Sequence, residues 1–231
     1  MTRPSEAPGA GVIGETLQAA IGRNHRANPV APGTGGPAGN ASLTAWIGLV
    51  LLALFLVECA TLISMSGLLV VHIFLGAFVV PLVVLKTATT GWRMFRYYSR
   101  EPYYVASGPP PALLRVLGPL VVLGAFAVVG TGLALIALGS ASRDHLFSVL
   151  GFRVDAVTLH QAAFVLWLST TGLHVLGRFV PALQLSRLAP PTVRPRHVPG
   201  ARARLALVGL TGATATATGL LVVNLSGWWL G

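Results

Sequence analysis

The sequence predicts an all-α polytopic membrane protein, and three observations support this fold class. The 231 residues are 54% hydrophobic and only 10% charged, with a mean hydropathy of +0.74. Several apolar runs are about twenty residues long, which is the length an α-helix needs to cross a bilayer. The basic residues are concentrated in alternate connections between these runs, as the positive-inside rule expects. The net charge of +10 is therefore a topology signal, and no nucleic-acid binding is predicted.

The chain divides into three segments. Residues 1–42 are rich in Gly, Pro, Ala and Asn and lack an apolar run, so we expect a mostly disordered cytoplasmic segment, with a short helix over 11–23 as an alternative for part of it. No apolar stretch precedes a cleavage site, and the first span is expected to act as the uncleaved insertion signal. Residues 43–225 form the transmembrane domain, and 226–231 form a short outer tail.

The transmembrane domain is predicted to contain five spans. Their ranges are 43–64, 67–87, 113–138, 157–180 and 204–225, with a tight turn between the first two. The N-terminal segment and the connections after the second and fourth spans, counted together with the span ends that flank them, carry all Lys and Arg residues except Arg143 and Arg153. This imbalance places the N-terminus in the cytoplasm of a bacterial cell and, after five crossings of the inner membrane, the C-terminus outside.

Histidines within the spans are the strongest functional signal. His160 and His174 are fourteen residues apart, close to four helical turns, so both face nearly the same side of the fourth span. His72 lies in the second span, which runs parallel to the fourth, at a depth similar to that of His160. Membrane histidines are costly unless paired, and two facing imidazoles are the axial ligands of a b-type haem. Gly76 would leave room for a flat macrocycle, and Phe164 could pack on it. The alternative is that each histidine bonds a backbone carbonyl or a water pocket.

The segments VHIFLGAFVVPLVVLK and LHQAAFVLWLSTTGLH resemble the bacterial b-type membrane cytochromes of the cytochrome b561 and ferric-reductase-like kind. The resemblance covers about residues 43–180. It implies a four-helix haem-binding bundle in which two helices each carry two histidines and hold two stacked haems. It also implies an extracytoplasmic oxidoreductase partner that exchanges electrons with the quinone pool.

One residue departs from the pattern of that family. Lys86 lies fourteen residues after His72, where the family pattern has a histidine, and it matches His174 in depth. Three interpretations stay open: Lys86 reaches the cytoplasmic interface, it pairs with a haem propionate or a quinone, or it is itself an axial ligand after losing its proton. His174 could instead find a ligand partner in His197 or His25. One haem is therefore predicted, with a second as an alternative.

Other polar residues are candidates for supporting roles. Glu58 is the only acid within a span, and it would relay a proton to a quinone, orient a ligating imidazole, or bond the helix backbone as a neutral acid. Arg143 and Arg153, in the outer connection, are candidates to hold haem propionates. His145 in the same connection is expected to be a surface residue.

The leading interpretation is an electron-transfer subunit of an oxidoreductase complex rather than a self-contained enzyme, because the chain contains no nucleotide-binding fingerprint and no soluble catalytic domain. The expected partners are membrane lipids, quinone and a redox partner protein. Two alternatives remain: a proton- or solute-conducting subunit that uses the buried ionisable residues as a relay, and a haem-free accessory subunit of a larger membrane complex.

Overall fold

The computed structural model describes residues 11–22, 27–186 and 198–230. The described chain is almost wholly helical, and its helices vary from one turn to more than nine turns in length. The elements are α1 Val12–Ala20, α2 Gly36–Thr61, η1 Leu62–Ser64, α3 Met65–Tyr98, α4 Pro102–Ala106, α5 Ala112–Leu138, η2 Gly139–Arg143, β1 Phe147–Val149, β2 Phe152–Val154, α6 Ala156–Leu185, α7 Ala201–Leu225 and α8 Gly227–Leu230.

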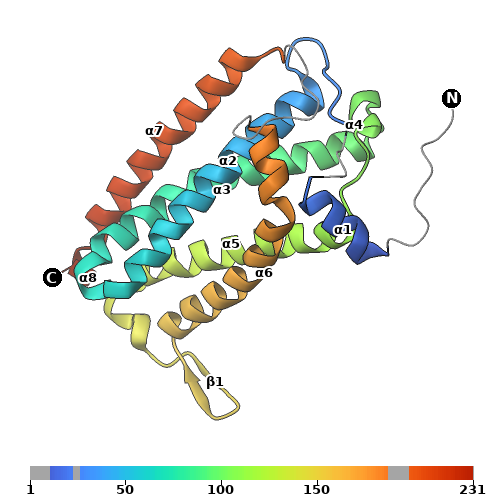
Figure 1. Ribbon diagram of the computed structural model, residues 1–231. Coiled ribbons are helices and arrows are strands. Elements are labelled where there is room, and N and C mark those ends of the chain that lie inside the picture. The colour runs from blue at the N-terminus through green and yellow to red at the C-terminus, as the bar shows by residue number, and fades with distance from the viewer. Residues whose placement is uncertain (1–10, 23–26, 187–197, 231) are drawn as a thin grey trace, which may run out of the picture.

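Four stretches of the described residues are long and apolar enough to cross a membrane. The first, Gly36–Tyr98, contains both α2 and α3, which fold back on each other at η1 (Figure 1). The other three correspond to α5 with η2, to α6 and to α7. The prediction of an all-α membrane fold is thus supported, and each of the five predicted spans coincides with a separate long helix. That all five helices cross the bilayer remains a proposal.

Two of the predicted spans were too short at one end. The helix α3 continues to Tyr98, eleven residues beyond the predicted end at 87, and α2 begins at Gly36 rather than at 43. The segment expected to be mostly disordered contains α1, which falls within the short helix considered for 11–23, and the start of α2. The connection between α5 and α6, predicted to lie outside the membrane, forms a small antiparallel hairpin, in which Phe147 pairs with Val154, and this hairpin was not predicted.

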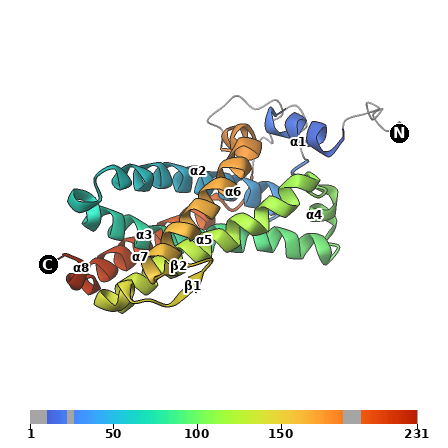
Figure 2. The same cartoon turned by 90° about the horizontal axis from the view of Figure 1, so that it is seen from below.

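Four helices surround the centre of the molecule. α2 packs on α3 and α6, and α5 packs on the same two helices from the other side (Figures 1 and 2). α3 and α6 therefore lie diagonally opposite each other and do not share an extended backbone contact. α7 packs on the outside of α3, where the ring of Phe74 lies against Gly219, and Ile73, Ala77 and Val222 form a small buried cluster at this contact.

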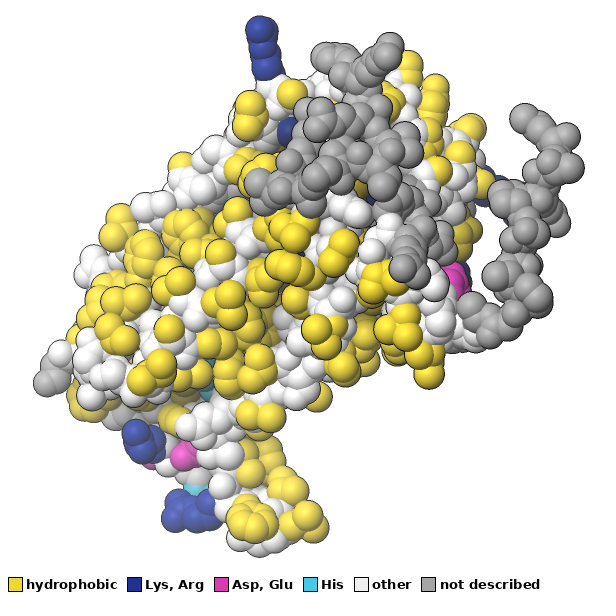
Figure 3. Space-filling view, viewed as in Figure 1, with side chains coloured by type: hydrophobic (Ala, Val, Ile, Leu, Met, Phe, Trp, Pro, Cys, Tyr) yellow, Lys and Arg dark blue, Asp and Glu magenta, His cyan; other side chains and the backbone are white. Residues whose placement is uncertain are grey.

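The outer surface is largely apolar. Figure 3 shows hydrophobic side chains spread over the flank of the bundle, with charged side chains near its two ends. Many large apolar residues on α2, α5, α6 and α7 are more than half exposed, for example Leu123, Leu166 and Leu210. Such a surface is unfavourable in water and suits contact with lipid chains.

The start of α6 is fixed by a side-chain cap. Asp155 Oδ1 accepts hydrogen bonds from the backbone nitrogen and the hydroxyl of Thr158, both at 2.7 Å. These bonds hold the pKa of Asp155 below its ordinary value. The cap sets where the helix begins, and His160 follows within its first turns.

Candidate functional site

A central cavity of about 1360 Å³ lies between α2, α3, α5 and α6. Most of the residues singled out from the sequence line it. They are Glu58, His72, Gly76, Lys86, Arg143, His160, Phe164 and His174. Arg153, by contrast, is exposed on β2 and does not line the cavity. His145 is also exposed and pairs with Ser148, as expected of a surface residue.

His72 and His160 meet across the cavity, from the two diagonally opposite helices. Their ring centroids are 6.5 Å apart and the ring planes are nearly perpendicular, at 84°. The matched depth that the sequence suggested for these two residues is thus present in the structure. The rings are too far apart for a direct hydrogen bond to explain the arrangement by itself.

The hydrogen bonds around His72 indicate which of its nitrogens carries the proton. Nδ1 lies 2.9 Å from Thr61 Oγ1 and 3.0 Å from Glu58 Oε1. The Thr61 hydroxyl donates its own hydrogen to the backbone carbonyl of Glu58, so its oxygen is left to accept from the imidazole. This arrangement favours the tautomer of His72 with its proton on Nδ1, which leaves the lone pair of the neutral ring on Nε2.

His160 has an equivalent arrangement on the other side. Its Nδ1 lies 3.0 Å from Thr131 Oγ1. The Thr131 hydroxyl donates to the carbonyls of Ala127 and Val128 in its own helix, at 2.7 and 3.0 Å. This arrangement favours Thr131 Oγ1 as the acceptor from Nδ1–H, which leaves the lone pair of His160 on Nε2 as well.

The two imidazoles consequently fit a metal ion held between them. An imidazole nitrogen binds a metal at about 2 Å, so two rings on opposite sides of one ion place their centroids roughly 6 Å apart. The observed separation of 6.5 Å agrees with this value. The hydrogen bonds from each Nδ1–H to a hydroxyl or carboxyl oxygen are the outer partners that ligating histidines commonly have.

Two glycines leave space for these groups. A Cβ at Gly132 would come within 3.1 Å of Cε1 of His160, and a Cβ at Gly76 within 3.3 Å of Oε1 of Glu58. Gly76 thus accommodates the carboxyl group that contacts His72, and it also lines the cavity. Gly130, two residues from Gly132, has nothing near its Cβ position.

The end of the cavity that holds Lys86 and His174, called the inner end below, differs from the end that holds His72 and His160, called the outer end. The Lys86 ammonium donates to the backbone carbonyl of Thr44 on α2. It lies so close to Gly48 that a Cβ there would approach Nζ to 2.7 Å. Because α3 continues for three more turns, Lys86 is not at a helix end, and its side chain reaches the neighbouring helix α2 beside the cavity.

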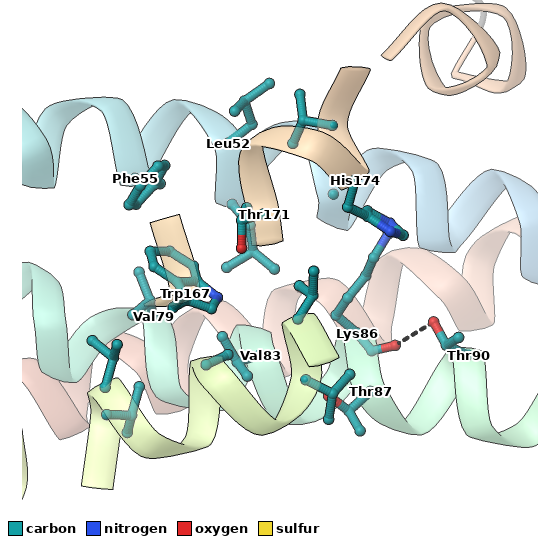
Figure 4. Close-up of a pocket in the computed structure, with 18 of the residues that line it drawn as sticks. Leu52, Phe55, Val79, Val83, Lys86, Thr87, Thr90, Trp167, Thr171 and His174 are labelled. Atoms are coloured by element: carbon teal, nitrogen blue, oxygen red, sulfur yellow. Dashed lines mark hydrogen bonds between the residues drawn. The ribbon is translucent and has the colours of Figure 1, made fainter. Parts of the chain in front are cut away.

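His174 extends toward Lys86 from α6 (Figure 4). Its Nδ1 is buried and has no hydrogen-bond partner among the described residues. The two alternative partners named from the sequence, His25 and His197, lie outside the described residues. The matching depth of Lys86 and His174 is present, and a second histidine pair is absent from the described part of this end.

Several residues of the site were not identified from the sequence. Thr61 and Thr131 hydrogen-bond to the two imidazoles, and Gly132 leaves room for the ring of His160. Arg178 lines the inner end together with Lys86, although its position near the predicted span end suggested only a topology signal. A usable signal for Thr61 was its place three residues after Glu58, on the same face of the first span.

Comparison of the chain with protein-family models, with curated proteins and with solved structures gave no match. The resemblance to the b-type cytochromes therefore rests on the histidine pattern alone, and the site has to be interpreted from its own geometry.

Proposed function

We propose that the chain is an integral membrane b-type cytochrome subunit, which carries electrons through a haem held by His72 and His160. The observation that supports this function best is the pair of opposed imidazoles, each with Nδ1–H engaged by an oxygen acceptor and Nε2 left as the donor of a lone pair. Structural histidines would need no such matched arrangement on two helices that do not pack on each other.

The cavity also has room for a large cofactor. Small-molecule sites in proteins commonly enclose about 300–1,000 Å³, and the cavity of about 1360 Å³ exceeds that range. Its lining near the histidine pair is mostly apolar, with Phe164 and Val129 among the lining residues. An iron porphyrin would supply one-electron chemistry there.

The residues of the chain would have distinct duties in this function. His72 and His160 hold the metal, and Thr61 and Thr131 keep both imidazoles in the required tautomer and orientation. Glu58 places a carboxyl oxygen against His72 Nδ1, which increases the basicity of the ligand when the carboxyl is ionised. The surrounding apolar helices exclude water and lower the local dielectric.

The wider role proposed is electron exchange between the quinone pool and a partner oxidoreductase in the bacterial inner membrane. The chain has no catalytic domain of its own among the described residues, so the substrate chemistry would belong to the partner. Arg143, which lines the cavity near its outer end, remains a candidate to hold a propionate.

Purification of the full chain followed by a reduced-minus-oxidised spectrum tests this function. We expect one low-spin b-type haem per chain, counted by pyridine haemochrome, and complete loss of its signal in His72→Ala and in His160→Ala. His145→Ala is the matched control, because His145 is an exposed histidine of the outer connection, and this variant should keep the full signal.

A purified native protein without a Soret band, produced in cells with adequate haem, would contradict the proposal. So would an unchanged spectrum in both His72→Ala and His160→Ala. Insertion of each variant, checked by the yield of membrane protein, distinguishes the loss of cofactor from the loss of the chain.

A further inference from the structure

The inner end of the cavity gathers positive charge. Lys86 and Arg93 on α3 lie two helical turns apart on one face, and Arg178 projects from α6. All three line the cavity, and Arg178 is close enough to interact electrostatically with each of the other two. Three cations that converge in an apolar interior repel one another unless an anion lies between them.

No described acid neutralises this group. Of the acids in the described residues, Glu58 alone lines the cavity, and it contacts His72 at the other end. Glu101 is used by Arg96 and by the start of α4. Arg178 has no hydrogen bond or ion pair with a described residue, and the Nε of Arg93 is buried without a partner.

A line of unused hydrogen-bonding groups leads to these cations. Trp167 Nε1, Thr171 Oγ1 and His174 Nδ1 lie on one face of α6, and all three atoms are buried without a partner among the described residues (Figure 4). The neighbouring hydroxyls of Ser169 and Thr170 donate to carbonyls of their own helix, as helical Ser and Thr usually do in a membrane. The Thr171 hydroxyl does not, so it remains available to a ligand.

The apolar part of this chamber adjoins the polar part. Leu52, Phe55, Val79 and Val83 surround the region of Trp167, while Lys86 and His174 mark the polar end (Figure 4). A ligand that satisfies both parts has an anionic head and an apolar body. Basic pockets between membrane helices near the cytoplasmic side are known to bind lipid phosphates in this way.

The polar end of the chamber is distant from the histidine pair. His174 lies fourteen residues beyond His160 on the same helix, about 21 Å along its axis. A carboxylate of a porphyrin centred at His72 and His160 would not span that distance.

We infer that the chamber formed by Lys86, Arg93, Arg178, Trp167, Thr171 and His174 is a phosphate site that takes the head of an anionic lipid, with an acyl chain against its apolar part. Phosphate oxygens accept from the guanidinium groups and the ammonium, which balances the charge. The Trp167 N–H, seven residues before His174 on α6 and about 10 Å along the axis, is left to donate to an ester oxygen of the lipid. This assignment goes beyond the proposed electron transfer and does not depend on it.

The test uses the full chain, delipidated in a neutral detergent, and measures bound ligand by native mass spectrometry. The probes are dioleoyl-phosphatidylglycerol, dioleoyl-phosphatidylcholine and inorganic phosphate. We expect phosphatidylglycerol to bind at least tenfold more tightly than phosphatidylcholine, with inorganic phosphate only a weak competitor. If inorganic phosphate binds as tightly as phosphatidylglycerol and displaces it, the phosphate site stands and its source is a free anion.

Variants locate the site. Arg178→Gln should weaken phosphatidylglycerol binding about tenfold or more, since each lost charge-assisted bond leaves a phosphate oxygen less well held. Arg202→Gln is the matched control: Arg202 is an exposed arginine of α7 that does not line the cavity, and its loss should change binding less than twofold. Two milder variants serve if Arg178→Gln fails to fold. Trp167→Phe removes only one N–H, and Gly48→Ala displaces the Lys86 ammonium.

Three results would overturn the assignment: equal binding of the two lipids, equal losses in Arg178→Gln and Arg202→Gln, or two haems per chain with one lost in Arg178→Gln. The last would assign the chamber to the carboxylates of a second porphyrin. Because the readout is bound lipid mass, a protein that binds no haem but retains phosphatidylglycerol would contradict the proposed function and leave the phosphate site standing.

Discussion

The two ends of the cavity use the same pair of helices for opposite purposes. At the outer end, His72 and His160 face each other and every Nδ1 hydrogen has an acceptor. At the inner end, Lys86 faces His174, and three buried polar atoms of α6 have no described partner, namely Trp167 Nε1, Thr171 Oγ1 and His174 Nδ1. The difference shows that a repeat of fourteen residues sets the position of a side chain but not its chemistry. The supporting residues on α2 and α5 decide whether an imidazole is prepared to hold a metal.

The largest expected effect is the on-or-off signal of a reporter that tests which end of the cavity faces the cytoplasm. A reporter that is active only outside the cytoplasm should give full signal when fused near Ser142 and none near Ser107. The reason is the concentration of Lys and Arg in the N-terminal segment and in the connections after the second and fourth spans. Signal at Ser107 and none at Ser142 would place the His72–His160 pair on the cytoplasmic side.

Converting the inner end into a copy of the outer end is the next test. Lys86→His should place an imidazole opposite His174 and raise the haem count from one toward two per chain, measured by pyridine haemochrome. Lys86→Ala, the control, should leave the outer spectrum intact. A native chain with two low-spin haems that both survive Lys86→Ala would show that the two ends are alike after all.

A smaller effect is expected from crowding one imidazole. Gly132→Val forces a branched side chain into the space beside His160, where even a Cβ would lie 3.1 Å from the ring. Overpacking of this kind costs about 1–3 kcal/mol, so we expect haem affinity to fall roughly tenfold or more in a titration of the haem-free protein. Gly130→Val, where nothing lies within 4 Å of the Cβ position, is the matched control and should bind as the native protein does.

The smallest expected effect distinguishes the hydrogen-bond partners of His72 from those of His160. Among the described residues, Thr131 is the only one whose side chain accepts a hydrogen bond from His160 Nδ1, and Thr131→Val removes this acceptor. Thr61→Val, in contrast, leaves His72 Nδ1 with the carboxyl of Glu58. Loss of such an outer partner commonly weakens metal binding about 10–100-fold. We therefore expect a larger loss of haem affinity and a larger shift in reduction potential for Thr131→Val, with Thr170→Val unchanged. Equal effects of Thr61→Val and Thr131→Val would mean that Glu58 does not support His72.

Hydrophobic runs and helical periodicity predicted the helices and the approach of His72 to His160. The helices of a membrane protein can be predicted from its sequence, because an apolar run of sufficient length has few alternatives to a helix within the bilayer. The end of α3 was misplaced, since a hydropathy window reports the apolar part of a helix and not its polar continuation to Tyr98. The contact between Thr61 and His72 depends on the register set at η1, which no local pattern encodes.

The inner end shows the same limit in another way. Lys86 was expected either to leave the cavity or to serve a ligand, and the choice depended on α2, where Thr44 supplies a carbonyl and Gly48 supplies the space. Arg178 was counted as a topology residue because its charge and position fit that rule. Only the placement of α3 and α6 on opposite sides of the cavity shows that Arg178 shares a chamber with Lys86.

The diagonal placement of α3 and α6 has a consequence for the life of the protein in the cell. With little backbone contact between them, these helices are joined mainly through α2, α5 and whatever occupies the cavity. A cofactor that bridges His72 and His160 would then stabilise the assembled bundle by mass action, in proportion to the logarithm of its free concentration above the Kd. Quality-control proteases act on chains that open, so the steady-state amount of this protein would rise and fall with the haem supply of the cell, without any change in transcription.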